Sequence, residues 1–336
     1  MDKNRLRYGV ALVALLLWWT TGCAFFAEPP EEEPPPPAPT VAARPDGQPR
    51  SPGDGDGDGG GRGSDRASDR DSDRADDAQH PRTASDPQLP VGERPTVLYL
   101  GDSIAMESQV ALGDAVAAGG RATVHSAPYS GTTLCDYLTG RPSGSLVPDK
   151  DKAAALVATH RPRAVVLQFW GNSWGFTPCM NNIPQGSGRY YTRYAQDAEA
   201  LTEQIAGAAR RAGIPRPRII WVLQGPDAFS SDRTRRVNEL YQARAAASGD
   251  AVADAGKAVS PSGGRYDWRR SLPCNAEERN RRGACRNGLA ALHRDDDPLH
   301  FCLAPTTSTP RPCPAPSPGI TRYTQAIASA VASHVN

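Results

Sequence analysis

Short apolar runs alternate with helix-like patterns over the C-terminal two thirds of this 336-residue chain. Five apolar runs predict strands, at 96–100, 122–125, 164–169, 219–223 and 251–253. Apolar residues at three-to-four spacing and Ala-rich stretches predict the helices between them, at 105–118, 153–159, 190–212, 235–247 and 320–331. Strands that alternate with helices form a parallel sheet covered on both faces. We therefore expect a three-layer α/β/α domain with a flavodoxin-like parallel sheet of about five strands.

The N-terminus has the pattern of a secretory signal. Three basic residues precede an apolar run at 8–19, and small residues follow as far as Cys23. The Gly-Cys junction resembles a bacterial lipobox, so we expect residues 1–23 to be a signal peptide and Cys23 to be lipidated. An uncleaved anchor is the alternative, since residues 8–26 are barely long enough to span a bilayer. Both arrangements predict an exported protein at the outer face of the cytoplasmic membrane, in the cell envelope.

A long segment after the signal cannot contribute to a core. From Glu28 to about Arg94 it consists of Pro runs, Gly/Asp repeats and Ser-Asp-Arg copies, with hardly any aliphatic or aromatic side chain. We expect residues 24–94 to be a disordered linker. Residues 95–336 then form one domain, within which 260–317 lacks a long periodic segment but holds four cysteines. That region is expected to be a disulfide-stapled excursion from the sheet.

The cysteines agree with export. Apart from Cys23 there are six, an even number, and they contain no Cys-x-x-Cys pair that would suggest zinc. Disulfides are therefore expected, and six cysteines allow fifteen pairings. Local pairing keeps the closed loops short and favours Cys135–Cys179, Cys274–Cys285 and Cys302–Cys313.

The first predicted strand ends in a Gly-Asp-Ser turn at 101–103, directly before a predicted helix. A serine there points out of the sheet, beside free backbone N–H groups and the positive end of the helix dipole. That environment stabilises the anion that an attacked ester develops. His300 can act as the base for Ser103, and Asp297, three residues earlier, can orient the imidazole. These residues predict a serine hydrolase.

Four motifs in this order resemble those of the SGNH, or GDSL, hydrolase family. Gly-Asp-Ser at 101–103 matches the first block, Gly131 the second and Asn172 the third, and Asp297 with His300 matches the last. The resemblance covers residues from about 95 to the C-terminus and implies the SGNH-hydrolase fold. It implies that the oxyanion donors are the backbone N–H groups of Ser103 and Gly131 and the side chain of Asn172. It also implies that the enzyme uses no metal and no organic cofactor.

The third block departs from the family pattern. The family has Gly two residues before the Asn and Asp directly after it, whereas this chain has Trp170 and Ser173 at those positions. Aromatic side chains cluster here, and Trp170 and Trp174 are candidates for the substrate pocket. Packing is the equally strong alternative for both. Asn172 itself has the alternative role of a turn-forming residue after a strand.

Other residues compete for the catalytic roles. Ser173 lies in a Gly-x-Ser-x-Gly pattern typical of a nucleophile elbow, but loop residues follow it where a helix is required. Ser103 could be only a helix cap. His293 is the nearest substitute for His300, although no carboxylate lies three residues before it. Asp295 and Asp296 are close enough to share the assignment of Asp297.

The sequence therefore predicts an exported carboxylic-ester hydrolase. A net charge of +1 at pH 7 argues against nucleic acid as a partner. Export to the envelope suggests O-acyl or O-acetyl groups on an envelope polysaccharide or lipid as the ester, with the membrane contacted through the N-terminal lipid. We expect a monomer. An O-acyltransferase with the same triad is one alternative, and a catalytically silent glycan-binding module is another.

Overall fold

The computed structural model describes residues 94–120, 122–140, 145–173, 177–305 and 311–335. The predicted signal peptide, lipid site Cys23 and linker therefore lie outside the described residues, apart from Arg94. No helix among the described residues is long and apolar enough to cross a membrane.

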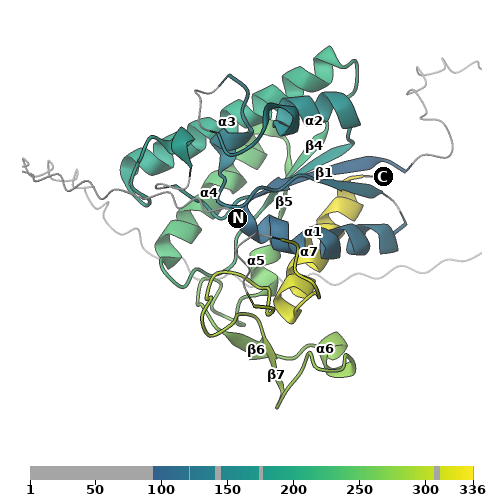
Figure 1. Cartoon of the computed structure of the whole chain (residues 1–336), viewed down its shortest axis with the longest axis vertical. Helices are drawn as coiled ribbons and strands as arrows, with labels where there is room; N and C mark the ends of the chain where they lie inside the picture. The colour runs from purple at the N-terminus through teal and green to yellow at the C-terminus, as the bar shows by residue number, and fades with distance from the viewer. Residues whose placement is uncertain (1–93, 121, 141–144, 174–176, 306–310, 336) are drawn as a thin grey trace, which may run out of the picture. The chain divides into compact units, whose positions relative to one another are not determined.

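A five-stranded, fully parallel sheet forms the centre of the domain (Figure 1). Its strands are β1 (Thr96–Gly101), β2 (Thr123–Ser126), β3 (Ala164–Gln168), β4 (Arg218–Val222) and β5 (Ala251–Ala253). They are ordered β2-β1-β3-β4-β5, which is the flavodoxin-like order. Register aligns Gly101 of β1 with Gln168 of β3, so both strands end at the same edge. The predicted three-layer α/β/α fold is confirmed.

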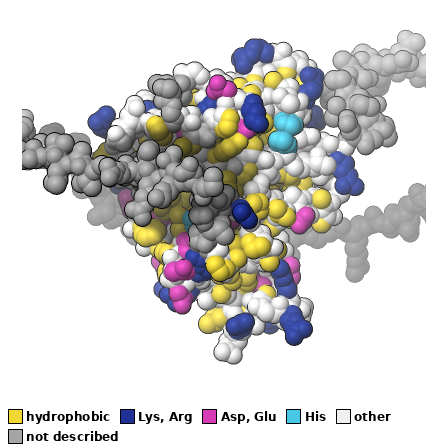
Figure 2. Space-filling model, viewed as in Figure 1, with side chains coloured by type: hydrophobic (Ala, Val, Ile, Leu, Met, Phe, Trp, Pro, Cys, Tyr) yellow, Lys and Arg dark blue, Asp and Glu magenta, His cyan; other side chains and the backbone are white. Residues whose placement is uncertain are grey.

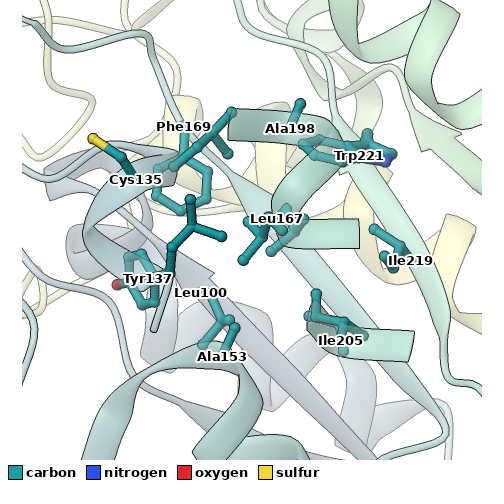
Figure 3. Packing of buried hydrophobic residues seen from close by; sticks show 14 of the residues in the cluster. Leu100, Cys135, Tyr137, Ala153, Leu167, Phe169, Ala198, Ile205, Ile219 and Trp221 are labelled. Carbon is teal, nitrogen blue, oxygen red and sulfur yellow. The ribbon is translucent and has the colours of Figure 1, made fainter. Parts of the chain in front are cut away.

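Each face of the sheet has its own apolar core. In β1, Leu98 and Leu100 face one core, while Val97 and Tyr99 face the other. The first core packs against α2 (Ala153–His160), α3 (Gly188–Arg211) and α4 (Ser231–Ser248), and Figure 3 shows part of this packing. The second core packs against α1 (Ser103–Ala118), α5 (Ala255–Ala258) and α7 (Pro318–His334). Burial on both faces explains why these strands are continuous apolar runs.

Helix starts differ from the sequence prediction by a few residues, because caps define them better than apolar spacing does. α3 begins at Gly188 after Ser187, whose hydroxyl accepts the Tyr190 N–H. α4 begins at Ser231, four residues before the expected start, because the Ser230 hydroxyl accepts the Arg233 N–H. Side-chain oxygens at these positions satisfy helix N–H groups that have no partner within the helix.

The excursion contains regular structure that the sequence did not predict. β6 (Ser271–Pro273) and β7 (Leu289–Ala291) form a short antiparallel pair, with α6 (Ala276–Asn280) between them (Figure 1). Strands of three residues are too short for a periodic pattern to reveal. All three expected disulfides are present, at Cys135–Cys179, Cys274–Cys285 and Cys302–Cys313.

Candidate active site

The turn that carries Ser103 requires a glycine at its start. A Cβ atom at Gly101 would lie 2.2 Å from the Gln168 carbonyl oxygen and 2.5 Å from the Ala105 Cβ. Asp102 then caps α1, its Oδ1 accepting the Ile104 N–H at 3.1 Å. Ser103 is consequently the first residue of α1, at the carboxyl end of β1, as the Gly-Asp-Ser pattern predicts.

The structure brings Ser103, His300 and Asp297 together, although 197 residues separate the serine from the histidine. His300 Nε2 lies 2.9 Å from Ser103 Oγ, and His300 Nδ1 lies 3.0 Å from Asp297 Oδ2. Asp297 Oδ1 also accepts the backbone N–H groups of Leu299 and His300, at 3.2 and 3.1 Å. The acid is therefore fixed in place by its own turn, and the imidazole lies between it and the serine hydroxyl.

The charges around this chain of hydrogen bonds favour an imidazolium. Burial lowers the pKa of His300, but the hydrogen bond to Asp297 and the charges of Glu107, Asp297 and Asp102 outweigh it, so the pKa is raised above 6.5. Burial opposes ionisation of Asp297 as well, yet its contacts with His300 hold its pKa well below the usual range. The Asp297–His300 pair therefore favours the protonated form of the imidazole.

The alternative base and acids have other partners. His293 is buried, and its Nδ1 lies 3.0 Å from the His300 carbonyl oxygen, where it supports the backbone of the catalytic turn. Asp295 pairs with Arg270 at 2.6 Å, and the Asp296 carboxylate pairs with the Arg294 guanidinium. Of the three consecutive aspartates, Asp297 is the one whose carboxylate lies within hydrogen-bond distance of the His300 ring.

The rival nucleophile, Ser173, is fully buried. Its hydroxyl has no hydrogen-bond partner among the described residues, so none of their basic side chains contacts it. A buried hydroxyl without a base lacks the activation that a nucleophilic serine requires.

The Gly131 loop packs against the nucleophile turn. Gly131 has a φ of 76°, a left-handed conformation that favours glycine. The next residue, Thr132, donates its hydroxyl to the Gly101 carbonyl at 3.2 Å. Within the described part of the chain, the backbone N–H groups of Ser103 and Gly131 have no acceptor. They are therefore available to an oxyanion, as the family resemblance implies.

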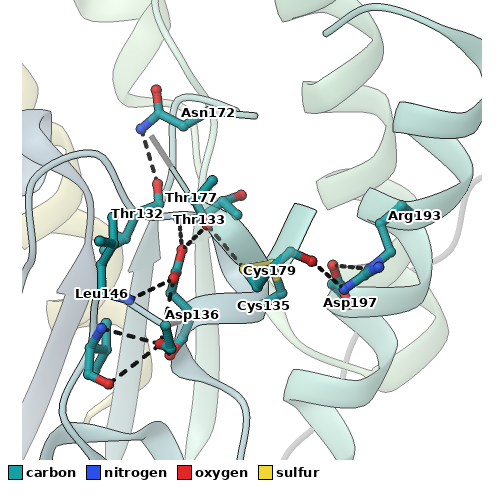
Figure 4. Close-up of a disulfide and its surroundings, with 12 residues drawn as sticks. Thr132, Thr133, Cys135, Asp136, Leu146, Asn172, Thr177, Cys179, Arg193 and Asp197 are labelled. Carbon is teal, nitrogen blue, oxygen red and sulfur yellow. Dashed lines mark hydrogen bonds and ion pairs between the residues drawn. A yellow bond between two sulfur atoms is a disulfide. The ribbon is translucent and has the colours of Figure 1, made fainter. Parts of the chain in front are cut away.

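Asn172 reaches the same turn, but its amide is occupied. Its Nδ2 lies 3.0 Å from the Thr132 carbonyl oxygen (Figure 4). The same nitrogen lies 3.4 Å from Asp102 Oδ2. The amide nitrogen therefore already has two acceptors within hydrogen-bond distance. An oxyanion contact from Asn172 requires the amide to release or share one of them.

The Cys135–Cys179 disulfide ties the loop after Gly131 to the loop after Asn172 (Figure 4). Beside it, Asp136 is fully buried and accepts the Thr133 N–H at 2.9 Å and the Thr177 hydroxyl at 2.7 Å. Covalent and polar contacts thus join the two loops beside the turn that carries Ser103.

Asp102 has more contacts than a helix cap requires. It is fully buried, and its Oδ2 accepts the Trp170 N–H at 2.6 Å. Burial raises its pKa to about 6 even though this hydrogen bond and the one from Ile104 oppose the shift. The cap therefore also connects the nucleophile turn to the end of β3.

Glu107 is a site residue that the sequence analysis missed. Its buried carboxylate accepts the Phe301 N–H at 2.8 Å and the Cys302 N–H at 3.1 Å, the two peptide groups directly after His300. Burial raises its pKa to about 7 against these hydrogen bonds. The residue lies four positions after Ser103, on the same face of α1, and this spacing is the signal that could have identified it. Glu107 positions the histidine loop on the helix that carries the serine.

A cavity of about 310 Å³ opens beside Ser103 and His300. Its walls include the apolar side chains of Met106, Pro312 and Pro314 and the cationic side chains of Arg294 and Arg311. Trp170, an expected pocket residue, does not line this cavity, because it is buried with the Arg233 guanidinium 3.7 Å from its ring centre. Trp174, the other one, lies outside the described residues.

No protein-family model and no curated protein matches the chain. Among solved structures, it is similar to a family 3 carbohydrate esterase from Clostridium thermocellum, with 11% identity over 72% of this chain and 98% of that one and a TM-score of 0.41. A putative GDSL-like lipase from Parabacteroides merdae gives 10% identity over 73% and 99%, with a TM-score of 0.40.

A third structure is the catalytic domain of peptidoglycan O-acetyltransferase A from Streptococcus pneumoniae. It is 14% identical over 72% of this chain and 96% of that one, with a TM-score of 0.35. At such identities and TM-scores the function has to be argued from the residues of this chain. In its motifs the chain resembles SGNH-type hydrolases, and the solved structures similar to it include a carbohydrate esterase, a GDSL-like lipase and an O-acetyltransferase domain.

Proposed function

We propose that the protein is a serine carboxylic-ester hydrolase. The observation that carries the proposal is the continuous chain of hydrogen bonds from Ser103 Oγ through the His300 ring to Asp297. Ser103 Oγ attacks the ester carbonyl carbon while its proton passes to His300 Nε2. The tetrahedral oxyanion accepts the N–H groups of Ser103 and Gly131, and Asp297 stabilises the imidazolium.

Collapse of the tetrahedral intermediate completes acylation. The C–O bond to the alcohol breaks, His300 returns its proton to the leaving oxygen, and the acyl group remains on Ser103. Water then gives a proton to His300 and attacks the acyl carbon, which releases the carboxylic acid and regenerates the serine hydroxyl. Every proton moves through His300, so no other base is required.

We further propose that the substrate is an envelope glycan or lipid whose hydroxyl carries a short acyl group, such as acetyl, in ester linkage. The cavity beside Ser103, at about 310 Å³, is near the lower end of the roughly 300–1,000 Å³ typical of ligand pockets. The N-terminal pattern supports an extracytoplasmic location. Cys23 would then anchor the domain through a lipid, and the segment 24–94 would act as a flexible tether.

Hydrolysis of p-nitrophenyl esters of increasing chain length tests the reaction and the acyl size together. We expect acetate and butyrate to be cleaved with the highest kcat/KM, and laurate at least tenfold less well. A preference for laurate would contradict the short acyl group, and no hydrolysis of any ester would contradict the hydrolase. Faster consumption of the ester on adding a sugar acceptor, with acylated sugar as product, would favour the acyltransferase instead.

The anchor has its own experiment. Cells that produce the Cys23→Ser variant should release or mislocalise the protein, and metabolic labelling with a lipid precursor should mark only the parent protein. Membrane retention of Cys23→Ser, with no lipid on the parent, would instead identify an uncleaved anchor.

A further inference from the structure

A second and larger hollow, of about 590 Å³, lies between the segment that joins β4 to α4 and the excursion. Three aromatic side chains line it: Phe229 on one side, and Tyr266 and Trp268 on the other. Its lining includes no residue of the cavity beside Ser103. The proposed hydrolysis assigns no task to this hollow.

Phe229 is unusually exposed for a large aromatic residue, with 69% of its surface accessible. Its backbone N–H donates to Asp227 Oδ1 at 2.8 Å, which fixes the turn that carries it. Its ring meets the ring of Trp170 edge-on, with centroids 6.5 Å apart and an interplanar angle of 83°. The ring is thus presented to solvent from a defined position.

A buried ion pair between Arg233 and Asp227 fixes the positions of Trp170 and Phe229. The Arg233 guanidinium pairs with Asp227, and the side chains are 2% and 0% exposed. The same guanidinium stacks on the Trp170 ring and donates to the Trp170 carbonyl oxygen at 2.6 Å. Burying such a pair carries a large desolvation cost, so its benefit here is the geometry that it imposes on Trp170 and Phe229.

The opposite wall is fixed to the catalytic turn. Trp268 donates its indole N–H to the Pro298 carbonyl at 3.0 Å, between Asp297 and His300 in the chain. Its ring also lies on His293, with centroids 5.5 Å apart. Behind the other wall, the Trp170 ring meets Phe229, and the Trp170 backbone N–H donates to Asp102, the neighbour of Ser103. The Trp268 wall is therefore linked to the His300 turn by a hydrogen bond, and the Phe229 wall to the Ser103 turn by a ring contact and a hydrogen bond.

The charges in the hollow nearly cancel. Asp227 is paired with Arg233, and Asp232 is paired with Arg235 and Arg236. The remaining charged lining residues, Asp267 and Arg269, are exposed and opposite in sign. On the face of the molecule that Figure 2 draws, the Lys and Arg side chains are scattered and do not form one broad patch. Such a hollow attracts neither a polyanion nor a polycation.

We propose that this hollow binds a neutral, polyhydroxylated sugar chain, and that it holds the glycan part of the ester whose acyl group enters the cavity at Ser103. Aromatic faces pack against the apolar C–H faces of sugar rings, while the Asp267 carboxylate and the Arg269 guanidinium can accept from and donate to hydroxyl groups. The inference rests on the proposed hydrolase and adds the position and chemistry of its glycan-binding surface.

Binding without turnover tests the hollow separately from the chemistry. The full-length Ser103→Ala variant is titrated calorimetrically with xylohexaose, cellohexaose, chitohexaose and maltohexaose. We expect at least one to bind, with Phe229→Ala in the same background weakening that binding about tenfold and Phe229→Tyr retaining it within about twofold. Leu289→Ala is the matched control, because Leu289 is 50% exposed on β7 and does not line the hollow.

Several results would overturn the inference. They are binding of none of the four sugars, equal binding by Phe229→Ala and its parent, or preferential binding of polygalacturonate or hexalysine. With the active enzyme, Phe229→Ala should raise KM for the acetylated form of the bound hexasaccharide about tenfold more than KM for p-nitrophenyl acetate. Absence of p-nitrophenyl acetate hydrolysis by the parent would contradict the proposed hydrolase, while sugar binding by Ser103→Ala would still support the hollow.

Discussion

The parallel sheet and the excursion hold their parts of the site in different ways. Ser103 follows a strand whose residues are buried on both faces, so apolar packing fixes its position. His300 lies in a segment without a long helix or strand. Its position depends on hydrogen bonds that this segment makes with Glu107, His293 and Trp268. Substitutions that disrupt the sheet should therefore unfold the domain. Substitutions that disrupt the excursion should lower activity before they unfold the domain.

The largest expected effect is on the nucleophile. Ser103→Ala should lower kcat for p-nitrophenyl acetate by about 10⁶-fold, as expected when the nucleophile of a triad is removed. The variant should keep its melting temperature, because Ser103 belongs to neither of the two apolar cores. Ser173→Ala is the control and should keep most of the activity. The reverse pattern would show that the wrong serine has been chosen.

A smaller loss is expected at the acid. Asp297→Asn should lower kcat by about 10³–10⁴-fold, because an amide cannot stabilise the imidazolium and can hold the wrong tautomer. The exposed Asp295, paired only with Arg270, supplies the matched control Asp295→Asn. Equal losses in the two variants would mean that Asp297 acts only through the general charge of the segment.

Substitution of Glu107 tests how α1, which follows the first strand of the sheet, is connected to the excursion that carries His300. Glu107→Gln loses one hydrogen bond to the histidine loop and the charge that helps to raise the pKa of His300. The parent's kcat/KM should rise with pH through a midpoint above 6.5, since only neutral His300 can accept the serine proton. In Glu107→Gln that midpoint should move to lower pH, and kcat should fall about 10–100-fold.

The matched control for this variant is Asp114→Asn, an exposed position on the same helix. A pH profile with an unchanged midpoint, together with reduced kcat, would limit Glu107 to a packing role. The fall in the midpoint is the outcome that a merely structural residue would not produce.

The smallest effects are expected from removing the two disulfides of the excursion, which should alter stability equally but activity differently. The Cys274–Cys285 and Cys302–Cys313 disulfides both span 11 residues, so their loss should lower the free energy of unfolding by a similar amount, about 2–3 kcal/mol. Cys302 lies two residues after His300 and donates its N–H to the Glu107 carboxylate, and Cys313 donates its N–H to the Glu107 carbonyl oxygen. Replacing the second pair by serine should therefore lower kcat/KM several-fold, and replacing the first should not.

Denaturant unfolding and p-nitrophenyl acetate kinetics measure the two quantities side by side. Equal losses of activity in the two double-serine variants would mean that the whole excursion acts as one unit. Loss of activity only in Cys302→Ser/Cys313→Ser would show that the Cys302–Cys313 disulfide, close to His300 in the chain, is the one on which activity depends.

Local patterns made much of this site predictable. The Gly-Asp-Ser turn requires a strand before it, a helix after it and a glycine at the close approach to Gln168, all of which the sequence contains. The Asp297-to-His300 turn is equally local. Both motifs, and the alternation of strands and helices, could be recognised from residues that are neighbours in the chain.

Contacts between distant segments could not be predicted. Glu107 accepts hydrogen bonds from peptide groups 194 and 195 residues away. Its spacing from Ser103 places it near the site but does not identify those partners. The Asn172 amide is taken up by the Thr132 carbonyl, which depends on how two loops meet. Trp170 was expected at the substrate pocket but is covered by Arg233 from α4. Strands as short as β6 and β7 show no periodicity to detect.

Covalent labelling tests the central claim most directly. The purified protein is treated with a fluorophosphonate ester, digested, and mapped by mass spectrometry. Activation of Ser103 by His300 predicts one adduct, on the peptide that contains Ser103, with loss of esterase activity in proportion to labelling and no adduct in Ser103→Ala or His300→Ala. An adduct on Ser173, or esterase activity that persists in fully labelled protein, would contradict it.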